Sequence, residues 1–199
     1  GDCYIRASYG NEEISSQVFE ISNKVFVTFD AGSGIFNPGE SFKVSGTAKK
    51  ANGEFLNGYV EVSIPGLNVS FLQQITSGTI GFNISIPVNT APAVYDIVIK
   101  AYEKDSSGSV LNEGDSGQFI KVRQIMTSAA VAISDQAVSP GKSISYTSLL
   151  YDQAGGEISD DVSLTIYDPN ENVYVKKLVR SGEAQNFVTV YNNTPGLWK

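Results

Sequence analysis

The sequence contains no histidine and a single cysteine, Cys3. Without histidine the chain cannot build a serine–histidine or cysteine–histidine nucleophile, a histidine-ligated zinc site, or the most common general base near neutral pH. One cysteine excludes a disulfide within the chain. We therefore predict a protein that is not an enzyme, has no catalytic residue, and folds by burial and backbone pairing, with Cys3 as a buried structural thiol.

Positive charge is also scarce, with 14 Lys and Arg against 21 Asp and Glu and a net charge of −7. Nucleic acids and anionic membranes are bound by clustered Lys and Arg, so we expect neither partner. No stretch approaches the roughly 18 consecutive apolar residues of a membrane-spanning helix. The first residues lack the basic and apolar regions of a signal peptide, so we expect no membrane insertion and no such peptide in this segment.

Apolar and polar residues alternate along most of the chain, for example in residues 42–45, 60–64 and 80–86. A period of two is that of a half-buried strand. Glycine-rich and asparagine-rich turn signals separate these stretches, and no segment of helical length shows a period of 3.6. Strands spaced about eight to twelve residues apart are typical of a β-sandwich, so the sequence predicts an all-β fold.

An internal repeat relates two parts of the chain. Residues 37–42 match residues 139–144 at an offset of 102 (139 minus 37). The same offset superposes the alternating apolar residues of 60–64 on those of 162–166. We therefore predict two sandwich modules, a complete one at 23–124 and one at 125–199 that lacks its last strands.

The last two strands of the first copy have no counterpart in the second copy. The N-terminal segment 1–22 resembles these two strands. Residues 4–9 resemble 98–102, and residues 16–21 resemble 117–122. The other explanation of this match is that apolar and polar residues alternate in any two β-hairpins. If the match is structural, segment 1–22 is a β-hairpin that completes the second sandwich, within one chain or by strand exchange between neighbouring copies.

Three stretches of the first copy, residues 38–48, 58–64 and 93–101, resemble prokaryotic immunoglobulin-like cell-surface repeats. Residues 163–173 of the second copy are similar to the same broad family, which includes bacterial and archaeal surface modules and macroglobulin-like domains. The resemblance implies two tandem immunoglobulin-like β-sandwiches, located outside a prokaryotic cell or on its surface. Its motifs are turn-and-strand patterns, which specify architecture rather than activity.

Acidic residues near two predicted turns are the candidates for a metal site. Calcium binds carboxylate and carbonyl oxygens, so Asp160, Asp161 and Asp168 are weak calcium candidates, although neither run has the spacing of a known calcium loop. Asp168 also begins an Asp-Pro-Asn-Glu-Asn sequence that is typical of a solvated β-turn. Outward-facing tyrosines could stack on sugars or simply pack in half-buried strands; they are Tyr59, Tyr102, Tyr151, Tyr167, Tyr174 and Tyr191.

The sequence therefore favours a non-catalytic extracellular structural or interaction module: a spacer, adhesin or surface-layer repeat of a larger protein. Its expected partners are other copies or neighbouring modules of the same protein. We expect no cofactor unless the acidic runs bind calcium. The alternative hypothesis is a carbohydrate- or calcium-binding accessory domain of an extracellular enzyme.

Overall fold

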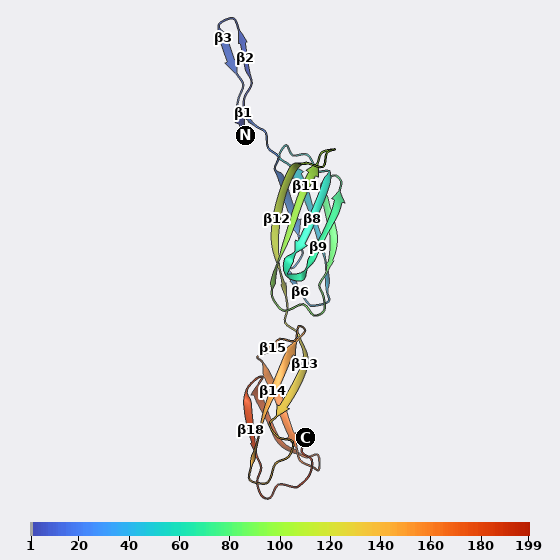
Figure 1. Ribbon diagram of the computed structural model, residues 1–199, viewed down its shortest axis with the longest axis vertical. Helices are drawn as coiled ribbons and strands as arrows, with labels where there is room; N and C mark the ends of the chain where they lie inside the picture. The colour runs from blue at the N-terminus through green and yellow to red at the C-terminus, as the bar shows by residue number, and fades with distance from the viewer. Residues whose placement is uncertain (1) are drawn as a thin grey trace. The chain divides into compact units, whose positions relative to one another are not determined.

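The computed structural model describes residues 2–199, and these residues form strands joined by turns (Figure 1). The all-β prediction is confirmed: the described residues contain no α-helix and one short 3₁₀ helix, η1 (Pro65–Leu67). Accordingly, no helix within residues 2–199 is long and apolar enough to cross a membrane. The chain divides into two compact units; the first extends through Phe36 and includes Glu40–Ile86 and Val94–Lys121, and the second comprises Asn37–Gly39, Pro87–Ala93 and Val122–Lys199.

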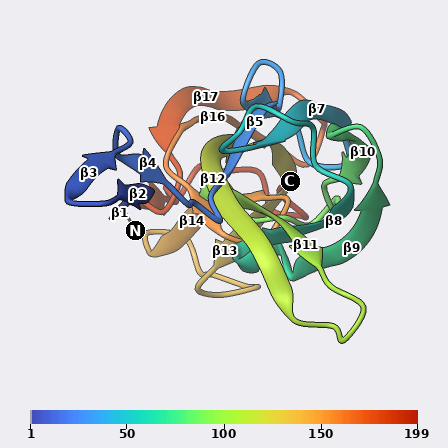
Figure 2. The ribbon, with the colours of Figure 1, turned by 90° about the horizontal axis from the view of Figure 1, so that it is seen from above.

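The first unit is a sandwich of two sheets, which Figure 2 shows as opposite layers. The three-stranded sheet has the order β10-β7-β5, with β5 at Val25–Asp30, β7 at Ser41–Lys50 and β10 at Thr79–Ser85. The other sheet has the order β6-β12-β11-β8-β9; its strands are β6 (Ile35–Phe36), β8 (Gly58–Ile64), β9 (Val69–Ile75), β11 (Val94–Lys104) and β12 (Val110–Val122).

The core of the first unit follows from the alternation in its strands. Val60, Val62 and Ile64 are fully buried on β8, and Ile97 and Ile99 are fully buried on the adjacent strand β11. Successive side chains of a strand point to opposite faces, so each strand gives one face to the core and the other to solvent. The buried faces of the two sheets close one continuous apolar core.

The second unit also has two sheets. Strand β14 (Ser143–Asp152) pairs with β13 (Met126–Ile133) on one edge and with β15 (Glu157–Ile158) and β18 (Ala184–Val188) on the other. The remaining sheet contains β16 (Asp161–Tyr167) and β17 (Val173–Arg180), which form an antiparallel pair.

The offset of 102 found in the sequence carries over to the strands. Strand β14 begins at Ser143 and ends at Asp152, each 102 residues after the ends of β7. The register agrees as well: Thr28 lies opposite Thr47 in the first unit, and Ala130 lies opposite Leu149 in the second. The same offset therefore relates positions in the two units.

The N-terminal residues form a hairpin. Strand β2 (Arg6–Tyr9) pairs with β3 (Glu12–Ser15) across a two-residue turn, and β1 (Asp2–Cys3) pairs with β4 (Phe19–Glu20). Gly10 adopts a φ of 59°, a backbone conformation that glycine reaches without strain. Every residue of β2 and β3 is exposed, and Cys3 is only half-buried. The prediction that Cys3 is a buried structural thiol is therefore wrong.

Candidate functional site

An open cleft of about 700 Å³ lies between the two sheets of the second unit. Strands β13 and β14 form one wall and β16 the other, and the segment after β18 closes one end. Most of the side chains that line it are apolar, as in protein-binding and ligand-binding grooves. The apolar lining residues are Val131, Ile133, Ala137, Val138, Pro140, Ile144, Tyr146, Val162, Leu164, Ile166, Phe187, Val190, Pro195, Leu197 and Trp198.

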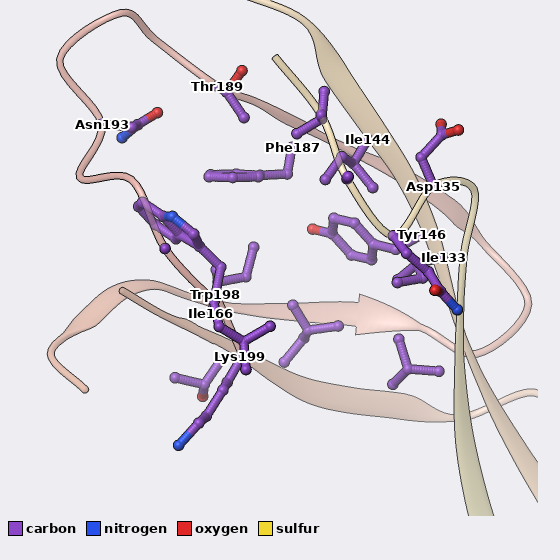
Figure 3. Close-up of a pocket in the computed structure, with 18 of the residues that line it drawn as sticks. Ile133, Asp135, Ile144, Tyr146, Ile166, Phe187, Thr189, Asn193, Trp198 and Lys199 are labelled. Atoms are coloured by element: carbon purple, nitrogen blue, oxygen red, sulfur yellow. The ribbon is translucent and has the colours of Figure 1, made fainter. Parts of the chain in front are cut away.

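The side chains in the cleft separate by polarity. In Figure 3 the rings of Tyr146 and Phe187 point into the space, while the Lys199 amine and the Asp135 carboxylate point away from it. Trp198 packs against Phe187 with ring centroids 5.5 Å apart, and its indole N–H donates to the carbonyl of Thr194 (3.1 Å). The interior is therefore apolar and the charges lie at its rim.

The cleft exposes positions that are core in the first unit. Val60, Val62 and Ile64 are fully buried, whereas residues 162, 164 and 166, their counterparts at an offset of 102, are only half-buried. In the first unit β8 is covered on one edge by β11. Among the described residues of the second unit, β16 has no strand in that place. The core of the second unit is thus open along β16.

The uncovered edge of β16 also presents backbone groups. The Tyr167 N–H donates to the Lys199 carbonyl (2.8 Å), and the Lys199 N–H donates to the Tyr167 carbonyl (3.2 Å). Backbone groups alternate in direction along a strand, so those of Thr165 and Ser163 face the same edge as those of Tyr167. No described strand pairs with them there. Such an edge is a template for the addition of another strand.

One buried polar group faces the cleft. Ser148 on β14 lines it and is 2% exposed, and its hydroxyl has no hydrogen-bond partner among the described residues. A buried hydroxyl without a partner destabilises a fold by about 1–3 kcal/mol. An incoming segment with a polar group near Ser148 would remove this cost.

Two of the acidic calcium candidates, Asp160 and Asp168, accept local backbone N–H groups. Asp160 accepts the N–H of Asp161 (2.8 Å), and Asp168 accepts the N–H groups of Asn170 (2.9 Å) and Asn172 (2.8 Å). Within residues 2–199 no group of three or more His, Cys, Asp or Glu side chains is arranged to hold a metal ion. The structure therefore does not bring Asp160, Asp161 and Asp168 together as a ligand set.

Asp168 begins a five-residue loop that the chain uses three times. Asp105, Asp152 and Asp168 each accept, at one oxygen, the N–H groups of the second and fourth residues that follow, at 2.8–2.9 Å. These bonds help to hold the pKa of all three carboxyls below the usual range; the largest causes are the side chains of Ser107, Gln124 and Asn172, respectively. The carboxylates serve the turns, as sequence reasoning indicated for Asp168.

These turns predict a loss of stability in acid. A carboxyl whose pKa is lower in the folded chain contributes stability above its unfolded pKa of about 3.9, and the contribution is lost as the pH falls through the folded value. We expect the melting temperature of the second unit, followed by Trp198 fluorescence, to decrease once the pH is lowered below about 4. Asp152→Asn should lower the midpoint at pH 7 and flatten this acid dependence. Parallel pH profiles for the two proteins would contradict the role given to Asp152.

The six candidate tyrosines do not form one platform. Tyr59 and Tyr102 stack in the first unit with centroids 5.7 Å apart, and the Lys104 amine lies over both rings. The other four are in the second unit, where the Tyr174 ring packs edge-on against Trp198 (5.0 Å). A sugar-stacking platform needs several flat ring faces on one surface. Here Tyr59 and Tyr102 stack on each other and Tyr174 packs against Trp198, whereas Tyr191 is 87% exposed.

No protein-family model and no curated protein sequence matches this chain. Among solved structures it is similar to Escherichia coli alpha-2-macroglobulin activated by porcine elastase, at 13% identity and a TM-score of 0.37, over 98% of this chain and 21% of that one. It is also similar to the native conformation of the E. coli protein (12%, TM-score 0.37, covering 94% and 14%) and to the human OSCAR ligand-binding domain (14%, TM-score 0.32, covering 88% and 86%). The chain thus spans about a fifth or less of the two bacterial chains.

Proposed function

We propose that this chain is a non-catalytic structural and interaction module of a larger, extracellular prokaryotic protein, in which it acts as a spacer, adhesin or surface-layer segment. Its two units are then copies of one β-sandwich module. The proposal rests on the apolar cleft beside the edge of β16 that no described strand covers, a combination that suits the addition of a β-strand from another module.

The chemistry of the cleft supports an interaction role over catalysis. The groups with shifted pKa values are Lys100, Glu103, Asp105, Asp152 and Asp168, and none of them lines the cleft. Active sites normally gather such groups in one pocket. The proposal therefore assigns the cleft a role in binding and assigns no catalytic residue and no cofactor to it.

The arrangement also favours a strand over a small ligand. Strand addition uses a row of free backbone groups for affinity and apolar pockets for every second side chain. Strand β16 has both features. The backbone groups of Ser163 and Thr165 lie at its edge, and the half-buried side chains of Leu164 and Ile166 face the cleft. Within residues 2–199 no cluster of acidic side chains is arranged to hold a metal ion, and the six candidate tyrosines are divided between the two units. We therefore favour a strand over calcium or carbohydrate as the ligand.

A fluorescent dye tests whether the cleft is accessible. The full chain at low concentration should increase the fluorescence of 8-anilinonaphthalene-1-sulfonate, because an open apolar cleft binds this dye. Leu164→Lys places a charge in the cleft and should reduce the signal several-fold. Leu178→Lys is the matched control, because Leu178 is 67% exposed on the adjacent strand β17 and does not line the cleft. Equal signals from the two variants, or no signal from the wild type, would overturn the proposal.

A further inference from the structure

We infer that the first unit forms a covalent bond between the side chains of Lys50 and Asn112, with the Glu103 carboxylate as the proton carrier. The product is an amide that joins Nζ of Lys50 to Cγ of Asn112, and ammonia is released. All three residues belong to the first unit, so this bond is independent of the cleft and goes beyond the proposed function.

The three side chains occupy inward-facing positions at one end of the sandwich core. On β7, Lys50 follows the fully buried Ala48 by two residues. On β11, Glu103 follows the fully buried Ala101 by two residues, and Asn112 lies opposite Glu103 on β12. Every second side chain of a strand points to the same face, and opposite residues of a strand pair share a face. The three polar groups therefore meet between the two sheets.

A single carboxylate oxygen holds the two reacting groups together. Glu103 Oε2 lies 2.8 Å from Lys50 Nζ, and the same oxygen accepts the side-chain N–H of Asn112 at 2.9 Å. The two nitrogens are therefore at most 5.7 Å apart, the sum of these distances. Attack requires about 3–3.5 Å between the amine nitrogen and the amide carbon. Rotation about the bonds of the flexible Lys50 side chain supplies this approach.

The Lys50–Glu103 pair is more shielded from water than the other ion pairs. Within residues 2–199 there are four such pairs; the two side chains of this one are each 22% exposed, against 47–73% for those of the other three. Burial disfavours the charged forms of both lysine and glutamate. Shielding therefore lowers the cost of moving a proton from Lys50 to Glu103.

The resting site is an ion pair, because the bond to Lys50 is the largest cause that holds the pKa of Glu103 below its usual range. Transfer of one proton from Lys50 to Glu103 leaves a neutral amine, the nucleophilic form of lysine. The amine lone pair attacks Cγ of Asn112 and forms the new C–N bond.

Glu103 then acts as general acid and base. It carries protons from the attacking nitrogen to the amide nitrogen of Asn112, and the Cγ–Nδ2 bond breaks. Ammonium leaves with two of the three protons of the original Lys50 ammonium group, and Glu103 is ionised again. The step is redox-neutral, consumes no other reactant and occurs once in each chain.

The bond joins the two sheets of the sandwich. Lys50 is the last residue of β7 in the three-stranded sheet, and Asn112 is on β12 in the five-stranded sheet. A link between them closes a loop of the chain and restricts the unfolded state, as a disulfide does. The sequence has a single cysteine, so an amide between side chains gives the first unit a covalent link that cysteine cannot provide within the chain.

Mass spectrometry of the full chain tests for the bond. The unfolded wild type should be lighter than its sequence mass by one ammonia molecule. Trypsin should release a branched peptide that joins residues 50–100 to residues 105–121, because the modified Lys50 is no longer cleaved. A wild type that keeps its full sequence mass after prolonged incubation at neutral pH would overturn the inference, and the three residues would then form a structural ion pair only.

Three variants test the roles of the residues. Lys50→Arg keeps a positive charge beside Glu103, but a guanidinium is not deprotonated in proteins, so this variant should keep its full mass. Glu103→Gln removes the proton carrier and should slow the loss of ammonia at least about 100-fold; an unchanged rate would contradict the role of Glu103. Lys100→Arg is the matched control, because Lys100 and Glu113 form an exposed pair at the same 2.8 Å, and it should lose ammonia as the wild type does.

Cyclisation at an Asn-Gly sequence also releases ammonia, and the chain contains two such sequences, at 52–53 and 57–58. That reaction uses the backbone nitrogen of the glycine and does not need Lys50. A mass deficit that persists in Lys50→Arg, or a wild-type deficit without the branched peptide, would therefore overturn the inference. The wild-type mass and peptide decide the outcome even if a variant fails to fold.

Discussion

Replacing Ile64 by alanine is expected to destabilise the first unit by about 3 kcal/mol, whereas the same substitution at Ile166 should cost the second unit less than about 1 kcal/mol. The two positions are 102 residues apart on β8 and β16. Ile64 is fully buried, so its truncation leaves an enclosed cavity. Ile166 faces a cleft that is already open, so its truncation creates little new cavity.

Guanidinium unfolding measures both effects by linear extrapolation. The only tryptophan, Trp198, belongs to the second unit, so its fluorescence reports that unit, and circular dichroism reports the two together. Leu150→Ala is the control, because it shows whether the fluorescence signal detects the loss of a core side chain. Leu150 is 7% exposed on β14, so this variant should lose about 2–3 kcal/mol of the free energy of unfolding of the second unit. Equal losses at Ile64 and Ile166 would contradict an open core in the second unit.

Gly114→Ala is the second substitution with a large expected effect, a loss of about 2–3 kcal/mol from the first unit. Gly114 lies on β12 where β5 approaches it, and a Cβ atom at this position would overlap the backbone carbonyl of Val25. Because the obstacle is backbone, no side-chain rotation relieves it. The two sheets would have to separate at this corner.

Gly117→Ala on the same strand is the matched control. A Cβ at Gly117 meets nothing closer than the Ile97 carbonyl at 3.7 Å, an ordinary contact. Removing the conformational freedom of glycine should stabilise the strand by about 0.5–1 kcal/mol. Thermal unfolding followed by circular dichroism compares the variants, and a Gly114→Ala midpoint at or above that of Gly117→Ala would refute the close approach of β5 to β12.

Local pattern was sufficient to predict much of the fold. Alternation indicated the strands, and the offset of 102 found in the sequence also relates the bounds of β14 to those of β7. The Asp168 loop was predictable because aspartate accepts backbone N–H groups within its own turn. Each of these features depends on residues close together in the sequence or on comparison of two stretches of it.

The cleft depends on contacts that such patterns do not contain. Trp198 closes the cleft by packing against Phe187, and the buried Ser148 hydroxyl faces it from β14. Nothing near these residues in the sequence indicates either role. Cys3 was misjudged for a related reason: its alternation is that of a core strand, but the described part of its own unit provides no core that covers it fully. Pattern identifies an apolar face and leaves open what lies against it.

Amide hydrogen exchange at β16 tests the central claim most directly, since it reports whether the edge is paired. In dilute protein we expect the N–H groups of Ser163 and Thr165 to exchange nearly as fast as in an unstructured chain, while those of Leu164 and Ile166, which alternation directs to β17, are protected. When a β-strand of another module pairs along β16, Ser163 and Thr165 should become protected too. Slow exchange of Ser163 and Thr165 in the dilute monomer would contradict the account, because the edge would then already be closed within one chain.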